Sequence, residues 1–329
     1  GNRAANFSVQ NCDVLLVMGS RLPFAVTGYD RQAFAMNAKI VVIDVDTNEI
    51  CKNELMFPKR MIQVNVDIEA VLKNDILEKC NVNPKWQRSC SDTKRAWDTI
   101  KENKFFFNYS GISIYHVMEE FQKTKYDDSN FVLDAGSISY VGPTTLTYTL
   151  GRNFVFSPAQ ADMGCALPSA LGAASASKSK STYCITGDGS FMSNLQELAT
   201  LKQEGYDLKI ILLNNHGYLS ITNTQRNNYG NRIYGEHKGR GLYFPDYKDL
   251  CIAFDIPYMR IDHAADLHKI GDQHGPILFD VRCLVNETIA PYQARIGDKQ
   301  AGMHDMAPHY TVDELKSFQS IDLPYMREV

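Results

Sequence analysis

Ser181-Thr182-Tyr183-Cys184-Ile185-Thr186 is a short run rich in β-branched and aromatic residues, and Gly187-Asp188-Gly189-Ser190 follows it directly. A run of this length that ends in glycine predicts a buried strand that stops in a turn. Similar runs alternate with helical patterns along the chain, at residues 13–18, 39–46, 61–66, 130–134, 207–213, 257–261 and 276–282. This alternation predicts an α/β fold with two doubly wound parallel-sheet units.

The 329 residues are enough for two units, at roughly 100–200 residues per domain. Residues 1–75 hold three of the predicted strands and look like half of a doubly wound domain. Residues 76–110 lose the apolar pattern and predict an interdomain linker on the surface. Residues 111–290 hold the other five strands and predict a complete domain, and residues 291–329 predict a polar C-terminal tail.

Helical patterns occupy the intervals between the strands. Helices are expected near residues 67–74, 86–104, 111–124, 163–177, 191–204, 246–254 and 264–271. The chain opens with Gly1-Asn2-Arg3-Ala4, without an initiator methionine or a signal peptide. We therefore expect it to be cut from something longer.

Composition excludes several classes of protein. Apolar residues make up 44% of the chain, charged residues 22%, and the formal net charge is −4. A mildly acidic chain without a basic run gives no footprint for nucleic acid. No stretch approaches the ~20 apolar residues of a membrane helix, so neither nucleic acid nor membrane is an expected partner.

The eight cysteines are scattered and form no Cys-x-x-Cys pair. Zinc ribbons and redox motifs need such close pairs, so the sequence supports neither. Reduced core thiols in a cytoplasmic setting are the expectation.

Two turns carry the clearest chemical signal. The first is Gly187-Asp188-Gly189-Ser190, and the second is Asn214-Asn215-His216-Gly217, which directly follows the next predicted strand. Ligands of open α/β sheets bind beyond the carboxyl ends of the strands, so both turns are expected to face one site. Asp188 offers a carboxylate, Asn215 an amide oxygen and Gly217 a carbonyl, a donor set that suits Mg²⁺ and disfavours zinc.

The spacing of these turns resembles the signature of thiamine-diphosphate enzymes, Gly-Asp-Gly followed about two dozen residues later by Asn-Asn. The resemblance implies that Asp188, Asn215 and the Gly217 carbonyl hold Mg²⁺, which anchors the diphosphate of the cofactor. Two further segments match the family, Ala135-Gly136-Ser137 after a strand and Asp162-Met163-Gly164 before a helix of small residues. In the family, the side chain at the position of Met163 props the cofactor in its bent conformation. The implied cofactor-binding residues are Gly136, Ser137, Met163, Gly164, Gly187, Gly189, Ser190, His216 and Gly217.

Residues 1–75 resemble the second half of the central domain of acetolactate synthases, with Val26-Thr27-Gly28 and Asp44-Val45-Asp46 in the family order. The resemblance implies decarboxylation of a 2-oxo acid such as pyruvate and transfer of the resulting acyl carbanion to a carbonyl acceptor. Thr224 stands where those synthases carry tryptophan, and Ala25 where they carry arginine. FAD is a further cofactor that the resemblance admits, near Gly19-Ser20-Arg21 and Asp44-Val45-Asp46.

The family's general acid/base glutamate belongs to an N-terminal pyrimidine-binding domain that these residues do not include. The chain is therefore expected to be inactive alone, and the full-length protein is expected to be a homo-oligomer, a dimer or a tetramer. No complete catalytic set is assigned to this chain.

Three alternatives remain open at this stage. A 2-oxo acid decarboxylase would bind the same cofactor but protonate the product instead of transferring it. A non-catalytic or split-subunit protein would bind the cofactor and need a partner for the glutamate. A nucleotide-binding module is a weaker alternative, because no Gly-x-Gly-x-x-Gly motif is present.

Overall fold

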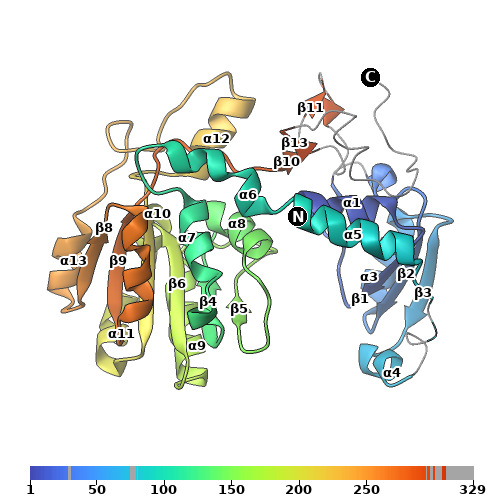
Figure 1. The fold of residues 1–329 in the computed structure, drawn as a ribbon, viewed down its shortest axis with the longest axis horizontal. Coiled ribbons are helices and arrows are strands. Elements are labelled where there is room, and N and C mark those ends of the chain that lie inside the picture. Colours follow the sequence, from blue (N-terminus) through green and yellow to red (C-terminus); the bar gives the residue numbers. More distant parts are fainter. Residues whose placement is uncertain are drawn as a thin grey trace. The chain divides into compact units, whose positions relative to one another are not determined.

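The computed structural model describes residues 1–28, 31–74, 79, 81–293, 295–296, 299–300 and 306–308. The chain divides into two compact units (Figure 1), residues 1–102 with 290–329 and residues 103–289. Most of the tail predicted at residues 291–329 lies outside the described residues, as do residues 76–78 and 80 of the predicted linker.

The first unit is built on a three-stranded parallel sheet in the order β1-β2-β3. These strands, β1 (Val14–Met18), β2 (Lys39–Asp44) and β3 (Met61–Asn65), confirm the three runs predicted from the sequence. Asp46 ends the second run because its side chain accepts a hydrogen bond from Asn48 N and caps the next helix. The helices of this unit are α1 (Arg3–Asn11), α2 (Phe24–Thr27), α3 (Thr47–Met56), α4 (Ile68–Leu72), α5 (Pro84–Ala96) and α6 (Thr99–Glu102), with the short 3-10 helix η1 (Arg31–Ala33).

Helix α5 is the polar helix predicted in the linker. It begins at Pro84, a favoured first residue, after the capping side chain of Asn83. Trp97 at its end is buried, and its ring meets that of Phe7 on α1 at 5.4 Å between centroids. Helix α5 and Trp97 therefore pack within the first unit.

The second unit contains a six-stranded parallel sheet in the order β5-β4-β6-β7-β9-β8. The sequence predicted five of its strands, β4 (Ser129–Leu133), β6 (Ser181–Gly187), β7 (Leu208–Asn214), β8 (Tyr258–Ile261) and β9 (Ile277–Arg282). The sixth, β5 (Asn153–Val155), is three residues long and escaped notice because so short a run has no readable period. Parallel pairing throughout the three-stranded and six-stranded sheets confirms the predicted fold class.

Helices cover both faces of the larger sheet. One face presents Val132, Cys184 and Leu212 to α9 (Ala166–Ala176), α11 (Glu197–Glu204) and α13 (Tyr247–Ala253). On the opposite face, Phe121 of α7 (Ile114–Phe121) packs edge-on against Phe131 and Tyr183. Apolar side chains on both faces explain why the strands read as continuous apolar runs.

Several helix boundaries differ from the prediction. Helix α10 (Asp188–Phe191) ends before α11 begins, and residues 264–272 form the 3-10 helix η4 (Ala264–Asp272). Helices α1, α2 and α3 of the first unit were not predicted. In the second unit two helices were missed, α8 (Ser137–Thr145), which contains Pro143, and α12 (Leu219–Asn228), which buries no residue and so lacks an apolar period. The remaining short elements are η2 (Lys104–Asn108), η3 (Thr124–Tyr126), β10 (Tyr292–Gln293), β11 (Arg295–Ile296), β12 (Lys299–Gln300) and β13 (Met306–Ala307).

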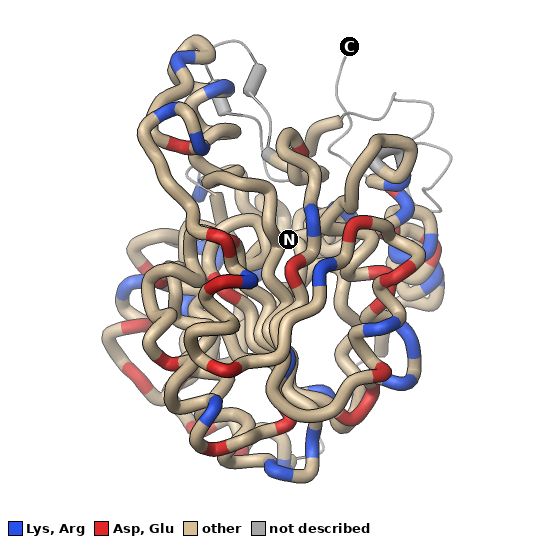
Figure 2. Tube along the Cα trace, turned by 90° about the vertical axis from the view of Figure 1, so that its left-hand side faces the viewer, with Lys and Arg blue, Asp and Glu red and all other residues tan. Residues whose placement is uncertain are grey.

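Figure 2 shows acidic and basic residues interspersed over the described part of the chain. No helix within that part combines the length and the apolar character needed to cross a membrane.

Shortening a side chain at the centre of the larger sheet should destabilise the protein. Ile211 on β7 is fully buried and pairs with Ile185 and Phe279 on the neighbouring strands. Ile211→Ala is expected to lower the free energy of unfolding by about 2–5 kcal/mol, because a cavity remains. The control Ile252→Ala, at a position 67% exposed on α13, should change it by less than about 0.5 kcal/mol. Urea unfolding followed by circular dichroism measures both, and equal losses would contradict the placement of Ile211.

Candidate functional site

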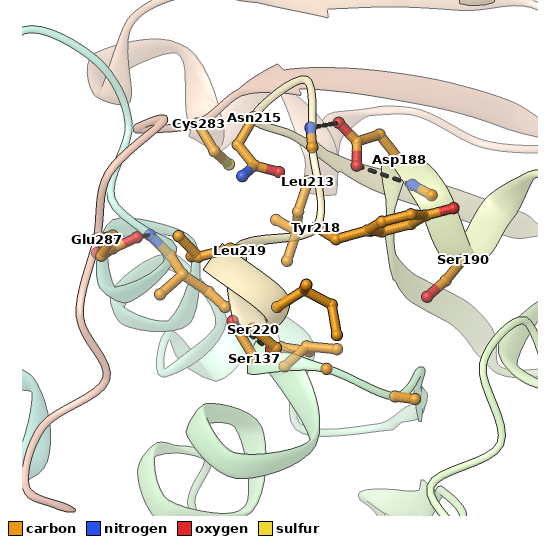
Figure 3. Close-up of a pocket in the computed structure, with 18 of the residues that line it drawn as sticks. Ser137, Asp188, Ser190, Leu213, Asn215, Tyr218, Leu219, Ser220, Cys283 and Glu287 are labelled. Carbon is orange, nitrogen blue, oxygen red and sulfur yellow. Dashed lines mark hydrogen bonds between the residues drawn. The ribbon is translucent and has the colours of Figure 1, made fainter. Parts of the chain in front are cut away.

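The carboxyl ends of β4, β6 and β7 lie at one edge of the larger sheet, because their pairing aligns Leu133 with Ile185 and Gly187 with Leu213. A cavity of about 440 Å³ opens at this edge (Figure 3). The loops after all three strands contribute to its lining, together with α12 and the segment after β9. Of the residues predicted from the sequence, the cavity is lined by Gly136, Ser137, Met163, Gly187, Asp188, Gly189, Ser190, Asn215 and Gly217.

Asp188 joins the two predicted turns. Its Oδ2 accepts a hydrogen bond from Gly217 N at 3.0 Å, and its Oδ1 accepts one from Gly189 N at 2.8 Å (Figure 3). The residue is 1% exposed. Burial raises the pKa of its carboxyl to about 7, and the charge of Asp280 contributes in the same direction. The buried carboxyl therefore favours its neutral form, and a cation bound beside it would offset the cost of ionisation.

The ring of Tyr218, a residue that was not predicted to belong to the site, requires glycine at position 189. A Cβ on Gly189 would lie 1.8 Å from Cε1 of Tyr218, whose ring also lines the cavity. Tyr218 meets Phe244 edge-on, with ring centroids 6.0 Å apart. No side chain at position 189 fits without displacing this ring, and that contact leaves no signal in the local sequence.

The second turn is held by a buried polar network. Asn214 donates through Nδ2 to Asp280 Oδ1 at 2.8 Å, and its Oδ1 accepts from His216 N at 3.2 Å. His216 adopts a left-handed backbone, with φ of +61°, which costs a non-glycine residue energy that the network offsets. This conformation leaves both Asn215 and Gly217 at the wall of the cavity.

The His216 side chain turns to another partner. Its Nε2 lies 2.8 Å from a terminal nitrogen of Arg282, and the residue is not among those that line the cavity. Burial, and then the charge of Arg282, lower the pKa of His216. The imidazole therefore belongs to the support of the turn, and its predicted contact with a cofactor gains no support from this arrangement.

The loop after β4 forms another wall. Gly136 caps α8 with φ of +85°, a conformation that favours glycine. The hydroxyl of Ser137 lies 3.5 Å from that of Ser220 on α12 (Figure 3), so two serine hydroxyls meet at the cavity.

Met163 lines the cavity with a side chain that stays half exposed, and Gly164 beside it does not line it. Gly164 instead packs tightly, because a Cβ there would lie 2.5 Å from that of Ser193. Its N–H donates to Asp134 Oδ1 at 2.8 Å. Asp134, a buried acid at the end of β4, was not predicted as a site residue.

Glu287 is a second buried acid that the sequence did not point to. It lines the cavity at the end opposite Asp188 in Figure 3 and is 2% exposed. Its carboxylate accepts hydrogen bonds from the hydroxyl of Ser113 and, at 3.1 Å, from Ile114 N, at the start of α7. Burial raises the pKa of Glu287 to about 7.

Among the described residues, no group of three or more His, Cys, Asp and Glu side chains is arranged to hold a metal ion. The candidate donor set instead combines one carboxylate, one amide oxygen and one backbone carbonyl, from Asp188, Asn215 and Gly217. All three residues line the same cavity, and oxygen donors of this kind are those that Mg²⁺ accepts.

Comparison with known proteins finds two family models along the chain. The thiamine pyrophosphate enzyme, central domain, matches residues 1–75, and the thiamine pyrophosphate enzyme, C-terminal TPP binding domain, matches residues 134–281. The second match includes both turns of the candidate site.

Curated relatives agree with these matches. The chain is 30% identical over 297 residues to the acetolactate synthase isozyme 2 large subunit of Escherichia coli (strain K12), covering 88% of this chain and 51% of that protein. It is 29% identical over 303 residues to the acetolactate synthase large subunit of Cyanidium caldarium, covering 88% and 50%. It is 30% identical over 313 residues to acetolactate synthase 2, chloroplastic, of Nicotiana tabacum, covering 90% and 44%. The chain spans about half the length of these relatives.

Glu287 should make stability depend on pH. Because its pKa is raised to about 7, the folded state favours the neutral acid. The free energy of unfolding should therefore fall as the pH rises from about 4.5 through 7, where the buried group must ionise. In Glu287→Gln this loss is absent, since glutamine stays neutral and the Ser113 hydroxyl can accept as well as donate.

Denaturation at pH 5 and pH 8 measures this effect. The stability of Glu287→Gln relative to the unaltered protein should rise by about 2–3 kcal/mol between the two values. Glu204→Gln, which removes an exposed carboxylate on α11, should give no comparable rise. A parallel response of the two variants would contradict the burial of Glu287.

Proposed function

The chain belongs to the thiamine pyrophosphate enzymes, and on that premise we propose that it holds the diphosphate-binding part of an acetolactate synthase-like enzyme. One observation carries this proposal, the 3.0 Å hydrogen bond from Gly217 N to Asp188 Oδ2. It joins the two turns of the family signature at the wall of a single cavity. In this proposal residues 111–290 are the diphosphate-binding domain, residues 1–75 the second half of the central domain, and residues 76–110 the linker between them.

Mg²⁺ fits the donors at this wall. Asp188 supplies the negative charge, while Asn215 and the Gly217 carbonyl supply neutral oxygens. A Mg²⁺ ion held by so few protein ligands keeps positions open for phosphate oxygens. Asp188 is buried, and a bound cation would stabilise its ionised carboxylate there.

Thiamine diphosphate fits the rest of the cavity. The hydroxyls of Ser137 and Ser190 are donors for diphosphate oxygens, and Gly136 and Gly189 let the backbone approach closely. Met163 gives an apolar support for the rings. When bound, the cofactor supplies an electron sink for breaking a carbon–carbon bond next to a carbonyl. The protein's own task is to bind and orient it, and the apolar side chains of Ile114, Leu213 and Leu219 line the cavity beside the polar groups.

The reaction that we propose joins two carbonyl compounds. A 2-oxo acid such as pyruvate loses carbon dioxide, and the remaining acyl unit is transferred to a carbonyl acceptor. The similarity to acetolactate synthase large subunits supports this choice. Thr224, which stands where such synthases carry tryptophan, keeps a simple 2-oxo acid decarboxylase as the second candidate. A product from pyruvate that appears only when an acceptor is added would separate the two.

Further parts of the enzyme are proposed outside these residues. The general acid/base glutamate is expected on a pyrimidine-binding domain, and a homodimer or tetramer is expected to complete the site. If the glutamate comes instead from a separate polypeptide, the chain is a split subunit that binds the cofactor and needs that partner for turnover. Co-purification of the natural protein with or without a second polypeptide decides this point.

FAD and the cellular compartment complete the proposal. FAD is a further proposed cofactor of the first unit, in which Gly19 follows β1 and Asp44 ends β2. An absorbance spectrum of the purified protein tests for it. A reducing, cytoplasmic compartment is supported by seven free cysteines among the described residues.

Removing the carboxylate of Asp188 should remove the metal dependence of cofactor binding. Asp188→Ala is expected to weaken thiamine diphosphate binding in the presence of Mg²⁺ at least about tenfold, and chelation of Mg²⁺ should then have no further effect. Titration calorimetry measures both. Asp249→Ala, an exposed position on α13, should bind as the unaltered protein does. Unchanged, Mg²⁺-dependent binding by Asp188→Ala would overturn the metal site.

A further inference from the structure

We propose that Asp134 is a positioning residue whose buried carboxylate fixes the Met163–Gly164 peptide at the wall of the cavity. The inference rests on the proposed function, in which Met163 supports the cofactor. Asp134 is 2% exposed and does not line the cavity, so any effect on the cofactor passes through the residues that it holds.

The carboxylate accepts hydrogen bonds from three different segments of the chain. Oδ1 accepts from Ala135 N and from Gly164 N, each at 2.8 Å. Oδ2 accepts from the hydroxyl of Thr186 at 2.8 Å and from Ala166 N at 3.4 Å. These donors belong to the loop after β4, to the segment that leads into α9 and includes its first residue, and to the end of β6. Each of these segments adjoins residues that line the cavity, among them Ser137, Met163 and Asp188.

A buried carboxylate needs such donors. Within the described residues, Asp134 forms no ion pair with a basic side chain, so backbone N–H groups and one hydroxyl stabilise its charge. If one of these segments moved away, the buried carboxylate would lose a hydrogen-bond donor. The free-energy cost of that loss is larger than for a hydrogen bond between neutral groups. The charge therefore holds the loops in one arrangement.

Gly164 is also held from its other side. Its carbonyl accepts a hydrogen bond from Asn194 Nδ2 at 2.9 Å, in the segment between α10 and α11. Its φ of +88° and the tight packing against Ser193 leave no room for another residue type. Both polar groups of one residue are thus bonded to side chains from other elements. The backbone beside Met163 is fixed while the Met163 side chain remains half exposed at the cavity.

Asp134→Asn tests this assignment with a nearly isosteric change. The amide nitrogen of asparagine must replace either Oδ1 or Oδ2. In both cases it faces at least one backbone N–H, so that two donors meet and a hydrogen bond is lost. Asn194→Ala is the second variant, because it frees the Gly164 carbonyl without altering the buried carboxylate. Asp162→Asn is the matched control, since it makes the same substitution at an exposed position of the same loop.

Binding of two ligands distinguishes a misplaced Met163 from a general loss of ligand binding. Thiamine diphosphate meets both the diphosphate site and Met163, whereas inorganic pyrophosphate meets only the diphosphate site. Titration calorimetry on the full-length protein with Mg²⁺ should show that Asp134→Asn loses about tenfold in affinity for thiamine diphosphate and roughly twofold or less for pyrophosphate. Asn194→Ala should likewise lower the affinity for thiamine diphosphate more than the affinity for pyrophosphate. Asp162→Asn should leave both affinities unchanged.

Hydrogen exchange supplies a readout that does not depend on any ligand. The amides of Gly164 and Ala166 should exchange about tenfold faster in Asp134→Asn than in Asp162→Asn, while the protection of β6 and β7 stays the same.

Three results would overturn the assignment. The first is unchanged exchange and unchanged affinity in both Asp134→Asn and Asn194→Ala. The second is an equal loss for both ligands, which would place the effect on the diphosphate site. The third is an unaltered protein that binds neither ligand, which would overturn the proposed function and this assignment with it. If Asp134→Asn does not fold, Asn194→Ala decides alone.

Discussion

Parallel pairing of β4, β6 and β7 is the constraint on which the second unit depends. The strands run in one direction and in register, so their carboxyl ends open onto the same edge of the sheet. Loops that are distant in sequence must then share that edge, and each has to satisfy its own polar groups there. Glycines at the closest approaches and side chains that accept from backbone N–H groups are the two means by which this chain does so.

Three buried acids lie at the cavity or directly behind its wall. Asp134, Asp188 and Glu287 are each at most 2% exposed, and backbone N–H groups solvate all three. Ionised groups in such surroundings respond strongly to any added charge. The three nevertheless differ in position, because Asp188 and Glu287 line the cavity and Asp134 does not. The first two can therefore meet a ligand directly, whereas Asp134 acts only through the loops around it.

Much of this could be predicted from the sequence, and the limits have physical causes. The turns at residues 187–190 and 214–217 were recognisable because each follows a predicted strand and because their spacing resembles the family signature. Helix α12 and strand β5 were not, because the first buries no residue and the second is three residues long. Tyr218, Asp134 and Glu287 matter through contacts with distant residues. Glu287, for example, meets Ser113 across 174 positions of the chain, and no local pattern records such a meeting.

The hydrogen bonds around Asp134 also bear on how the protein responds to ionic strength. Exposed pairs such as Lys202 with Asp255 on the surface weaken as mobile ions screen them, over a Debye length of about 8 Å at physiological salt. Mobile ions do not approach the backbone N–H groups around a buried carboxylate closely, so they screen these hydrogen bonds much less. Salt therefore weakens these hydrogen bonds much less than it weakens the surface ion pairs, and the segments around Asp134 should keep their arrangement at a salt concentration that loosens the surface pairs.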